Sequence, residues 1–273
     1  MGRLKNTILG DVTGKVGNIV FRVKGKKAYA YASPQKVKVS QTKEAKEARS
    51  KFTPLSKFAS YINSIPELKY FWKISDIKAS STYHKISKYN YSFFLHNRPT
   101  NKNEITPGWE NTSGRDPVRR TCLDRSGIGI EAKYEKGWFI PLDEEEFISA
   151  LAIICFYSPI KRWGKYFILD KLEKDKIEVE FVNPFEFQIP FTDTALNNYY
   201  SYRNSILYLT FITRDINGNP IRFSQNYKQE FIHEYSEEEK KSIDKIQGNK
   251  LREKIKEEYK GYMKRIFSKW RKE

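Results

Sequence analysis

Two short apolar runs flank a Lys-Gly pair near the start of the chain. Residues 18–32 carry β-branched and aromatic side chains on both sides of Lys24-Gly25, the pattern of two strands joined by a tight turn. Gly10, Gly14 and Gly17 precede the first of these runs, and glycine permits the positive φ that a compact turn requires. The pattern predicts a β-hairpin over residues 18–32, preceded by a glycine turn.

Residues 41–64 change to a helical period. Their apolar positions recur mostly at three- and four-residue spacing and are Ala45, Ala48, Phe52, Leu55, Phe58, Ala59 and Ile62. Either Ser40 or Thr42 can cap such a helix, and Pro54 is expected to kink or restart it. The segment therefore predicts one or two short helices, and residues 66–126 predict helix followed by an irregular connection.

From Gly127 onward, β-rich runs recur at fairly regular intervals, separated by turn signals such as the Asn-Gly-Asn-Pro at residues 217–220. The predicted strands cover residues 128–134, 137–140, 147–157, 166–170, 176–182, 185–190, 205–213 and 220–227. About eight such strands in succession are typical of an antiparallel β-sandwich.

The last segment predicts a basic amphipathic helix, weakened near Gly248-Asn249. Ser236 and Glu239 have the spacing of a capping box. A single stripe then follows at helical spacing, with the candidate packing residues Leu251, Ile255, Tyr259, Tyr262, Ile266 and Trp270. Such a stripe predicts a surface that packs against the same protein or a partner.

Composition narrows the class of protein. The chain has 273 residues with 18 Tyr, 18 Phe and 5 Trp and a mean hydropathy of -0.70, which indicates a folded protein with enough aromatic surface for one or two cores. Its longest apolar run, residues 150–157, is far shorter than a membrane span. The first ten residues lack a signal-peptide core, so neither a membrane nor secretion is expected.

The charge is concentrated at the two ends of the chain. Of a net charge of +17, residues 1–60 contribute 14 basic against 3 acidic residues, and residues 236–273 contribute 13 against 8. The segments between them are closer to neutral. Basic ends suit nucleic-acid phosphates or an acidic protein partner, and charge alone does not choose between these.

The candidate catalytic motifs are weak. Gly10 to Val16 is one residue short of a phosphate loop and lacks the Ser or Thr after Lys15 that would hold magnesium. Cys155 lies in an apolar run, and Cys122 follows two arginines without a visible base. Two cysteines and three histidines make neither a disulfide scaffold nor a four-cysteine zinc site. No enzymatic activity, metal or cofactor is predicted.

The predicted hairpin is the best candidate for binding. The candidate partner or phosphate contacts are Lys15, Arg22, Lys24, Lys26 and Lys27. Nearby aromatic residues can stack on bases while the basic residues hold phosphates. A tip that faces protein or solvent remains an alternative, because lysines on strand edges also block unwanted pairing.

The N-terminal residues also carry a family resemblance. The segments that carry it are ILGDVTGKVGNIVF at residues 8–21, Lys24-Gly25, Pro34, Thr42 and residues 49–52. They resemble the N-terminus of a family of uncharacterised proteins from Bacteroidetes and their phages and mobile elements, which has a G-K-x-G-N-x-V motif. Residues 150–159, 206–212, 217–218 and 224–227 are similar to strands of that family's immunoglobulin-like β domain. The resemblance implies a non-enzymatic structural protein of a virion or prophage.

Together these observations predict an α+β protein with an N-terminal hairpin and helices, an immunoglobulin-like antiparallel β-sandwich and a C-terminal amphipathic helix. The expected parts are a docking module at 1–65, a helical and irregular connection at 66–126, the sandwich at 127–235 and the basic helix at 236–273. We expect a structural component of a phage-like virion or other large assembly, located in the virion or in the cytoplasm of the producing cell. It would dock through its basic termini on copies of itself or on other structural proteins. The alternative is a nucleic-acid-binding protein of a ribonucleoprotein or DNA-containing particle.

Overall fold

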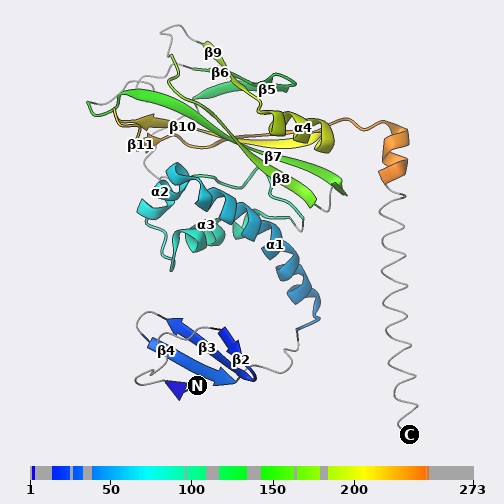
Figure 1. Ribbon diagram of the computed structural model, residues 1–273. Helices are drawn as coiled ribbons and strands as arrows, with labels where there is room; N and C mark the ends of the chain where they lie inside the picture. The colour runs from blue at the N-terminus through cyan, green and yellow to red at the C-terminus, as the bar shows by residue number, and fades with distance from the viewer. Residues whose placement is uncertain are drawn as a thin grey trace. The chain divides into compact units, whose positions relative to one another are not determined.

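The computed structural model divides the chain into two compact units, residues 1–46 and residues 47–273 (Figure 1). It describes residues 2–3, 14–24, 27–32, 39–95, 97–108, 117–133, 143–162, 165–178, 184–243 and 245. We call the first unit the N-terminal unit and the second the body. The expected division into four parts, with boundaries after residues 65, 126 and 235, stays a prediction.

The N-terminal unit is built around one antiparallel sheet. Its strands are β1 (Gly2–Arg3), β2 (Gly14–Val16), β3 (Ile19–Lys24) and β4 (Lys27–Ala32), in the order β1-β4-β3-β2. β3 and β4 form the predicted hairpin, with Lys24 opposite Lys27. Gly17, at a φ of 57°, begins the two-residue turn between β2 and β3, a conformation that glycine adopts without strain.

Three helices begin the body: α1 (Lys43–Ser64), α2 (Pro66–Ile74) and α3 (Thr82–Asn90), with a short 3-10 turn, η1 (Tyr91–Phe93), after them. Thr42 caps α1, because its hydroxyl oxygen accepts the backbone N–H of Ala45 at 3.3 Å. α1 runs through Pro54, so of the two predicted effects of this proline, a kink or a restart, the restart is wrong. A proline inside a helix costs about 3 kcal/mol, whereas each buried Leu, Ile or Phe contributes about 1.5–3 kcal/mol. Leu55, Phe58 and Ile62 are all buried on this helix.

A long antiparallel sheet forms the centre of the body. Its strands are β7 (Phe147–Arg162), β8 (Lys165–Lys174), β10 (Asn204–Arg214), β11 (Pro220–Phe223) and β12 (Tyr227–Phe231). β10 pairs with β7 on one side, and β11 and β12 follow each other along its other side. The single strand predicted at residues 220–227 is thus two strands, because residues 224–226 leave the ladder between them.

A smaller antiparallel sheet and a fourth helix complete the body. The strands are β5 (Val118–Asp124), β6 (Gly127–Ala132) and β9 (Phe185–Pro190), in the order β5-β6-β9, and the helix is α4 (Asp193–Tyr202). β5 lies where an irregular connection was predicted. It is an edge strand with one exposed face, so charged residues such as Arg119 and Arg120 interrupt its apolar pattern. The boundary expected after residue 126 coincides with the turn of the β5–β6 hairpin.

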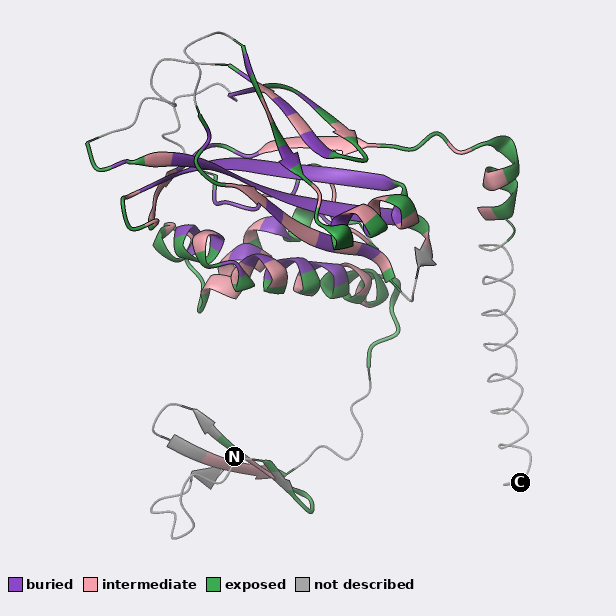
Figure 2. Ribbon diagram, turned by 45° about the horizontal axis from the view of Figure 1, so that its top comes forward, coloured by how far each residue is buried: buried purple, intermediate pink, exposed green. Residues whose placement is uncertain are grey.

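The central sheet is covered on both faces, as the purple strands in Figure 2 show. Helices α1 to α3 pack against one face, with Leu151, Ile153 and Cys155 of β7 in that core. The small sheet and α4 pack against the other, with Ile154 and Phe156 in a second core. All eleven residues of β10 are therefore buried. The fold is α+β as predicted, while these sheets do not establish an immunoglobulin-like sandwich.

The C-terminal segment is helical at residues 237–243. The predicted capping box is present there, since Ser236 Oγ accepts the Glu239 N–H at 3.2 Å and Glu239 Oε2 accepts the Ser236 N–H at 3.0 Å. The Ser236 N–H and the Arg203 guanidinium, which both donate to the Glu239 carboxylate, lower the pKa of that carboxyl group. The stripe from Leu251 to Trp270 lies outside the described residues. Among the helices that the structure describes, none is both long and apolar enough to cross a membrane.

Candidate functional site

The register of the N-terminal sheet gathers most of the predicted contact residues on one face. Residues directly opposite each other on antiparallel strands share a face. Lys15 is opposite Val20, Arg22 is opposite Tyr29 and Lys24 is opposite Lys27. We call this surface the basic face, and its positions are Arg3, Lys15, Val20, Arg22, Lys24, Lys27, Tyr29 and Tyr31. Lys26, also predicted as a contact, lies outside the described residues.

Arg22 lies beside an aromatic ring of the basic face. It is exposed, and its guanidinium carbon lies 5.9 Å from the centre of the Tyr31 ring. A cation held against an aromatic face keeps its N–H groups free to contact an anion at the edge. Tyr29 and Tyr31 thus share a face with Arg22, whereas Phe21, the third aromatic residue near this turn, lies on the opposite face.

The opposite face of this sheet is apolar, and we call it the apolar face. Its positions are Gly14, Val16, Ile19, Phe21, Val23, Ala28, Ala30 and Ala32. Val16 is 65% exposed and Ile19 is 47% exposed. Wherever burial is described in β2, β3 and β4, every residue is intermediate or exposed. The described part of this sheet therefore contributes no buried residue.

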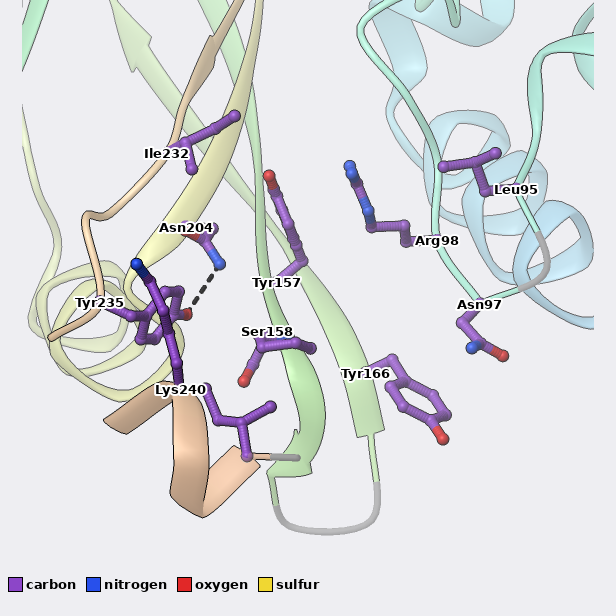
Figure 3. Close-up of a pocket in the computed structure, with 12 residues that line it drawn as sticks. Leu95, Asn97, Arg98, Tyr157, Ser158, Tyr166, Asn204, Ile232, Tyr235 and Lys240 are labelled. Carbon is purple, nitrogen blue, oxygen red and sulfur yellow. Dashed lines mark hydrogen bonds between the residues drawn. The ribbon is translucent and has the colours of Figure 1, made fainter. Parts of the chain in front are cut away.

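The body contains a separate pocket of about 760 Å³, shown in Figure 3. Leu95, Tyr166 and Ile232 are among the residues that line it, as are Lys240 and Ile243 from the C-terminal helical segment. Strands β7, β8 and β10 and the segment after η1 thus contribute side chains. Sequence patterns did not indicate this site, because its members come from parts of the chain that carry no shared motif.

The polar side chains of this pocket interact mainly with one another. The Arg98 guanidinium carbon lies 3.9 Å from the centre of the Tyr157 ring, and Arg98 Nη1 donates to Glu230 Oε1 at 3.0 Å. The Tyr157 hydroxyl donates to the same oxygen at 2.5 Å. Asn204 Nδ2 donates to the Tyr235 hydroxyl at 2.9 Å, the dashed line in Figure 3. These contacts stabilise the wall of the pocket, and Glu230 accepts hydrogen bonds from both Arg98 and Tyr157.

Two candidate nucleophiles of the body, Cys155 and Tyr157, are in environments that keep them protonated. Burial raises the pKa of the Cys155 thiol far above its usual range, and burial together with Glu230 does the same for Tyr157. Both groups are therefore protonated at neutral pH. Cys122 is exposed on β5, opposite Gly129 of β6. Within the described ranges, no group of three or more His, Cys, Asp or Glu side chains is placed to hold a metal ion.

No family model matches this chain, and neither a curated protein nor a solved structure is significantly similar to it.

Proposed function

We propose that this protein is a non-enzymatic structural component of a large assembly, such as a phage-like virion, and that it docks through its basic N-terminal unit. The observation that carries the proposal is the N-terminal sheet, which forms a unit apart from the body and has no buried residue among those whose burial is described. A sheet with an apolar face needs another surface to cover it. Docking supplies that surface.

The charge of the N-terminal unit favours an acidic partner. Residues 1–46 contain eleven basic and two acidic residues. The basic face collects five of these basic residues, which gives the unit a directional positive field. An acidic surface of a neighbouring protein would be attracted to this face, and salt would screen that attraction.

The resemblance of residues 8–21 to the N-terminal motif of Bacteroidetes and phage proteins supports the same proposal. The glycines of that motif include Gly14 and Gly17, both of which have positive φ. The immunoglobulin-like nature of the β region, implied by the same resemblance, is part of this proposal. So is docking by the stripe from Leu251 to Trp270.

The test is incorporation into particles by the full-length chain. Four basic-face residues are changed together in one variant: Lys15→Ala, Arg22→Ala, Lys24→Ala and Lys27→Ala. Four exposed lysines of the body are changed in a matched control that loses the same charge: Lys57→Ala, Lys69→Ala, Lys73→Ala and Lys78→Ala. Surface charge contacts contribute about 0.2–1 kcal/mol each, so four of them together contribute about 0.8–4 kcal/mol, and the first variant should incorporate about fourfold to nearly a thousandfold less.

Gradient sedimentation of the producing cell's particles, followed by mass spectrometry, measures this incorporation. Wild type and the body control should travel with the particles, while the basic-face variant stays near the top. A wild-type protein found only in the slow fractions would contradict the proposal. Equal incorporation of the two variants would remove the basic face from it.

Nucleic-acid binding is the second candidate, favoured by the Arg22–Tyr31 contact on a face that also holds three lysine positions. Each neutralised phosphate releases counterions, with a slope in log affinity of about 0.7 per phosphate on single strands. The basic-face variant should therefore reduce the salt slope by about 3 if all four residues contact phosphates. Filter binding of an oligonucleotide across a salt series measures the slope, and an unchanged slope would exclude this face as the contact.

A further inference from the structure

The pocket of the body brings exposed apolar side chains together in one place. Leu95 is 50% exposed and Ile232 is 70% exposed, and both line this pocket. The other aliphatic and aromatic side chains of the lining belong to Tyr157, Pro159, Tyr166, Tyr235 and Ile243. A gathering of exposed apolar residues in a concave site is typical of a binding surface.

The pocket also has the size of a small-molecule site. Its volume of about 760 Å³ lies within the range of about 300–1,000 Å³ that is usual for ligand pockets. Figure 3 shows the C-terminal helical segment on one side and the segment that carries Leu95 and Asn97 on the other, with the ends of β7 and β8 between them. A ligand in this pocket would therefore contact three parts of the body at once.

The charged side chains of the lining are both cations. They are Arg98 and Lys240, and no Asp or Glu is among the described residues that line the pocket. The hydrogen bonds that Arg98 donates to described residues, including Glu230, all come from Nη1, so Nε and Nη2 keep N–H groups for another acceptor. Lys240 Nζ donates to Glu237 at 2.7 Å, but both side chains are more than half exposed, and such a pair is weak.

This combination of apolar walls and cationic donors selects the ligand. We infer that the pocket binds a small organic acid, whose apolar body packs among the aliphatic and tyrosine side chains and whose carboxylate accepts from Lys240 and Arg98. A cationic ligand would bring like charges together. A purely apolar ligand would cover the free N–H groups of Arg98 without an acceptor. The site uses no residue of the N-terminal unit, so the inference goes beyond the proposed docking role.

The C-terminal helical segment forms a wall that a ligand would stabilise. Polar contacts hold this wall against the end of α4: Asn204 Oδ1 accepts the His233 N–H at 2.8 Å, and Arg203 forms an ion pair with Glu239. Both side chains of that ion pair are more than a third exposed, so water competes with it. A ligand that binds the folded wall shifts the equilibrium toward that state.

The first experiment tests the class of ligand. The purified full-length protein is titrated with 1-naphthaleneacetate, which has a bicyclic apolar body and one carboxylate, and binding is followed by ligand-observed NMR. The neutral matched control is 1-naphthaleneacetamide. The acid should bind with a dissociation constant of about 0.1–1 mM, as expected for a ligand of this size, and the amide should bind at least fivefold more weakly. Failure of the acid to bind, or equal binding of acid and amide, would overturn the inference.

The second experiment locates the acid with two pairs of variants. Lys240→Gln removes a cation from the pocket, while Lys241→Gln removes one from the exposed neighbour that does not line it. Ile232→Ser removes an exposed apolar side chain from the pocket, while Ile216→Ser removes one from a turn outside it. All four residues are exposed, so these variants should fold as wild type does. Each pocket variant should bind the acid at least threefold more weakly than its control, and equal affinities within either pair would overturn the inference.

Hydrogen exchange separates this pocket from the apolar face of the N-terminal unit, which can also attract an apolar probe. Addition of 1-naphthaleneacetate should slow exchange in residues 236–243 and leave residues 14–24 unchanged. Slowing that is confined to residues 14–24 would overturn the inference. These readouts need no particle and no nucleic acid, so they can fail or succeed independently of the proposed function.

Discussion

Removal of the Glu145 carboxylate should be among the most damaging single changes in the body. The Glu145 side chain is 1% exposed and forms an ion pair with Arg222. Arg222 Nε donates to Oε1 and Arg222 Nη2 donates to Oε2, both at 2.9 Å, so the contact is bidentate. The buried Thr213 hydroxyl also donates to Oε1 at 2.7 Å. Glu145 thereby joins the start of β7 to β10 and β11.

The expected loss follows from these contacts. Removal of one partner from a buried ion pair costs about 3–5 kcal/mol, because the other charge is left uncompensated. Arg222 is 26% exposed, so water can hydrate part of its guanidinium and the lower end of that range applies. The buried Thr213 hydroxyl loses its acceptor in addition, although the Arg222 carbonyl lies 3.4 Å away. We expect Glu145→Ala to lower the free energy of unfolding by about 3 kcal/mol.

Urea unfolding of the full-length chain, followed by tryptophan fluorescence, measures this loss. With a dependence on urea of about 2–3 kcal/mol per molar, the midpoint should fall by about 1–1.5 M. Glu144→Ala is the matched control, because Glu144 is exposed and exposed substitutions usually stay within about 0.5 kcal/mol. If the two variants unfold at the same urea concentration, the assignment of Glu145 as a buried structural anchor is wrong.

Three further predictions concern the core, the smaller sheet of β5, β6 and β9, and the response to alkaline pH. Trp72→Ala should cost about 3–5 kcal/mol in urea unfolding, because Trp72 is fully buried and its Nε1 donates to the Ile105 carbonyl at 2.7 Å; a loss below that of an exposed substitution would contradict this packing. Gly129→Ala would place a Cβ 2.5 Å from Cys122 Sγ, so it should destabilise by about 1–3 kcal/mol, and Cys122→Ala in the same chain should restore stability. Burial raises the pKa of Tyr61 to about 12, so the Tyr61 hydroxyl ionises at lower pH in the unfolded chain than in the folded protein. The free energy of unfolding should therefore fall as the pH rises from about 10 to 12. Tyrosinate absorbance of the folded protein measures the titration, and a pKa near 10 for every tyrosine would refute this prediction.

The sequence predicted strands best where local and tertiary preferences agree. The hairpin of β3 and β4 has β-branched and aromatic residues on both sides of a turn. The turn signal and the strand signals all lie within fifteen residues of one another. β10 was predicted to within about one residue at each end, because a strand buried on both faces reads as a continuous apolar run. Strands of this kind carry their signal in their own composition.

Elements that depend on distant partners were missed. Polar and apolar residues are mixed along β5. Its Thr121 is polar yet buried, and the Thr121 hydroxyl donates to Gln229, which lies more than a hundred residues later in the chain. α4 has weak amphipathicity and follows Thr192, whose hydroxyl oxygen accepts the Ala195 N–H at 3.2 Å. Its capping pattern was available in the sequence, but the surrounding β-rich runs obscured it.

The candidate site was predicted in its residue types but not in its geometry. The sequence identified Lys15, Arg22, Lys24 and Lys27 as basic residues near a turn, yet a cluster in sequence does not specify a face. The pairing of β2 with β3 brings Lys15 to the same face as the others. The division into a basic and an apolar face needs this register, because a shift of one residue would exchange the two.

The order in which the two cores of the body are synthesised also determines which apolar surfaces of the nascent chain are exposed. Helices α1 to α3 end at Asn90, but the strand that covers much of their apolar face, β10, ends at Arg214. At about 5–20 residues per second, these helices wait roughly 6–25 s before that partner has been made. Phe58, Phe71 and Trp72 would meanwhile be open to other nascent chains. Production of this protein should therefore depend on chaperones that shield the emerging helices, and slow translation after residue 90 should increase aggregation.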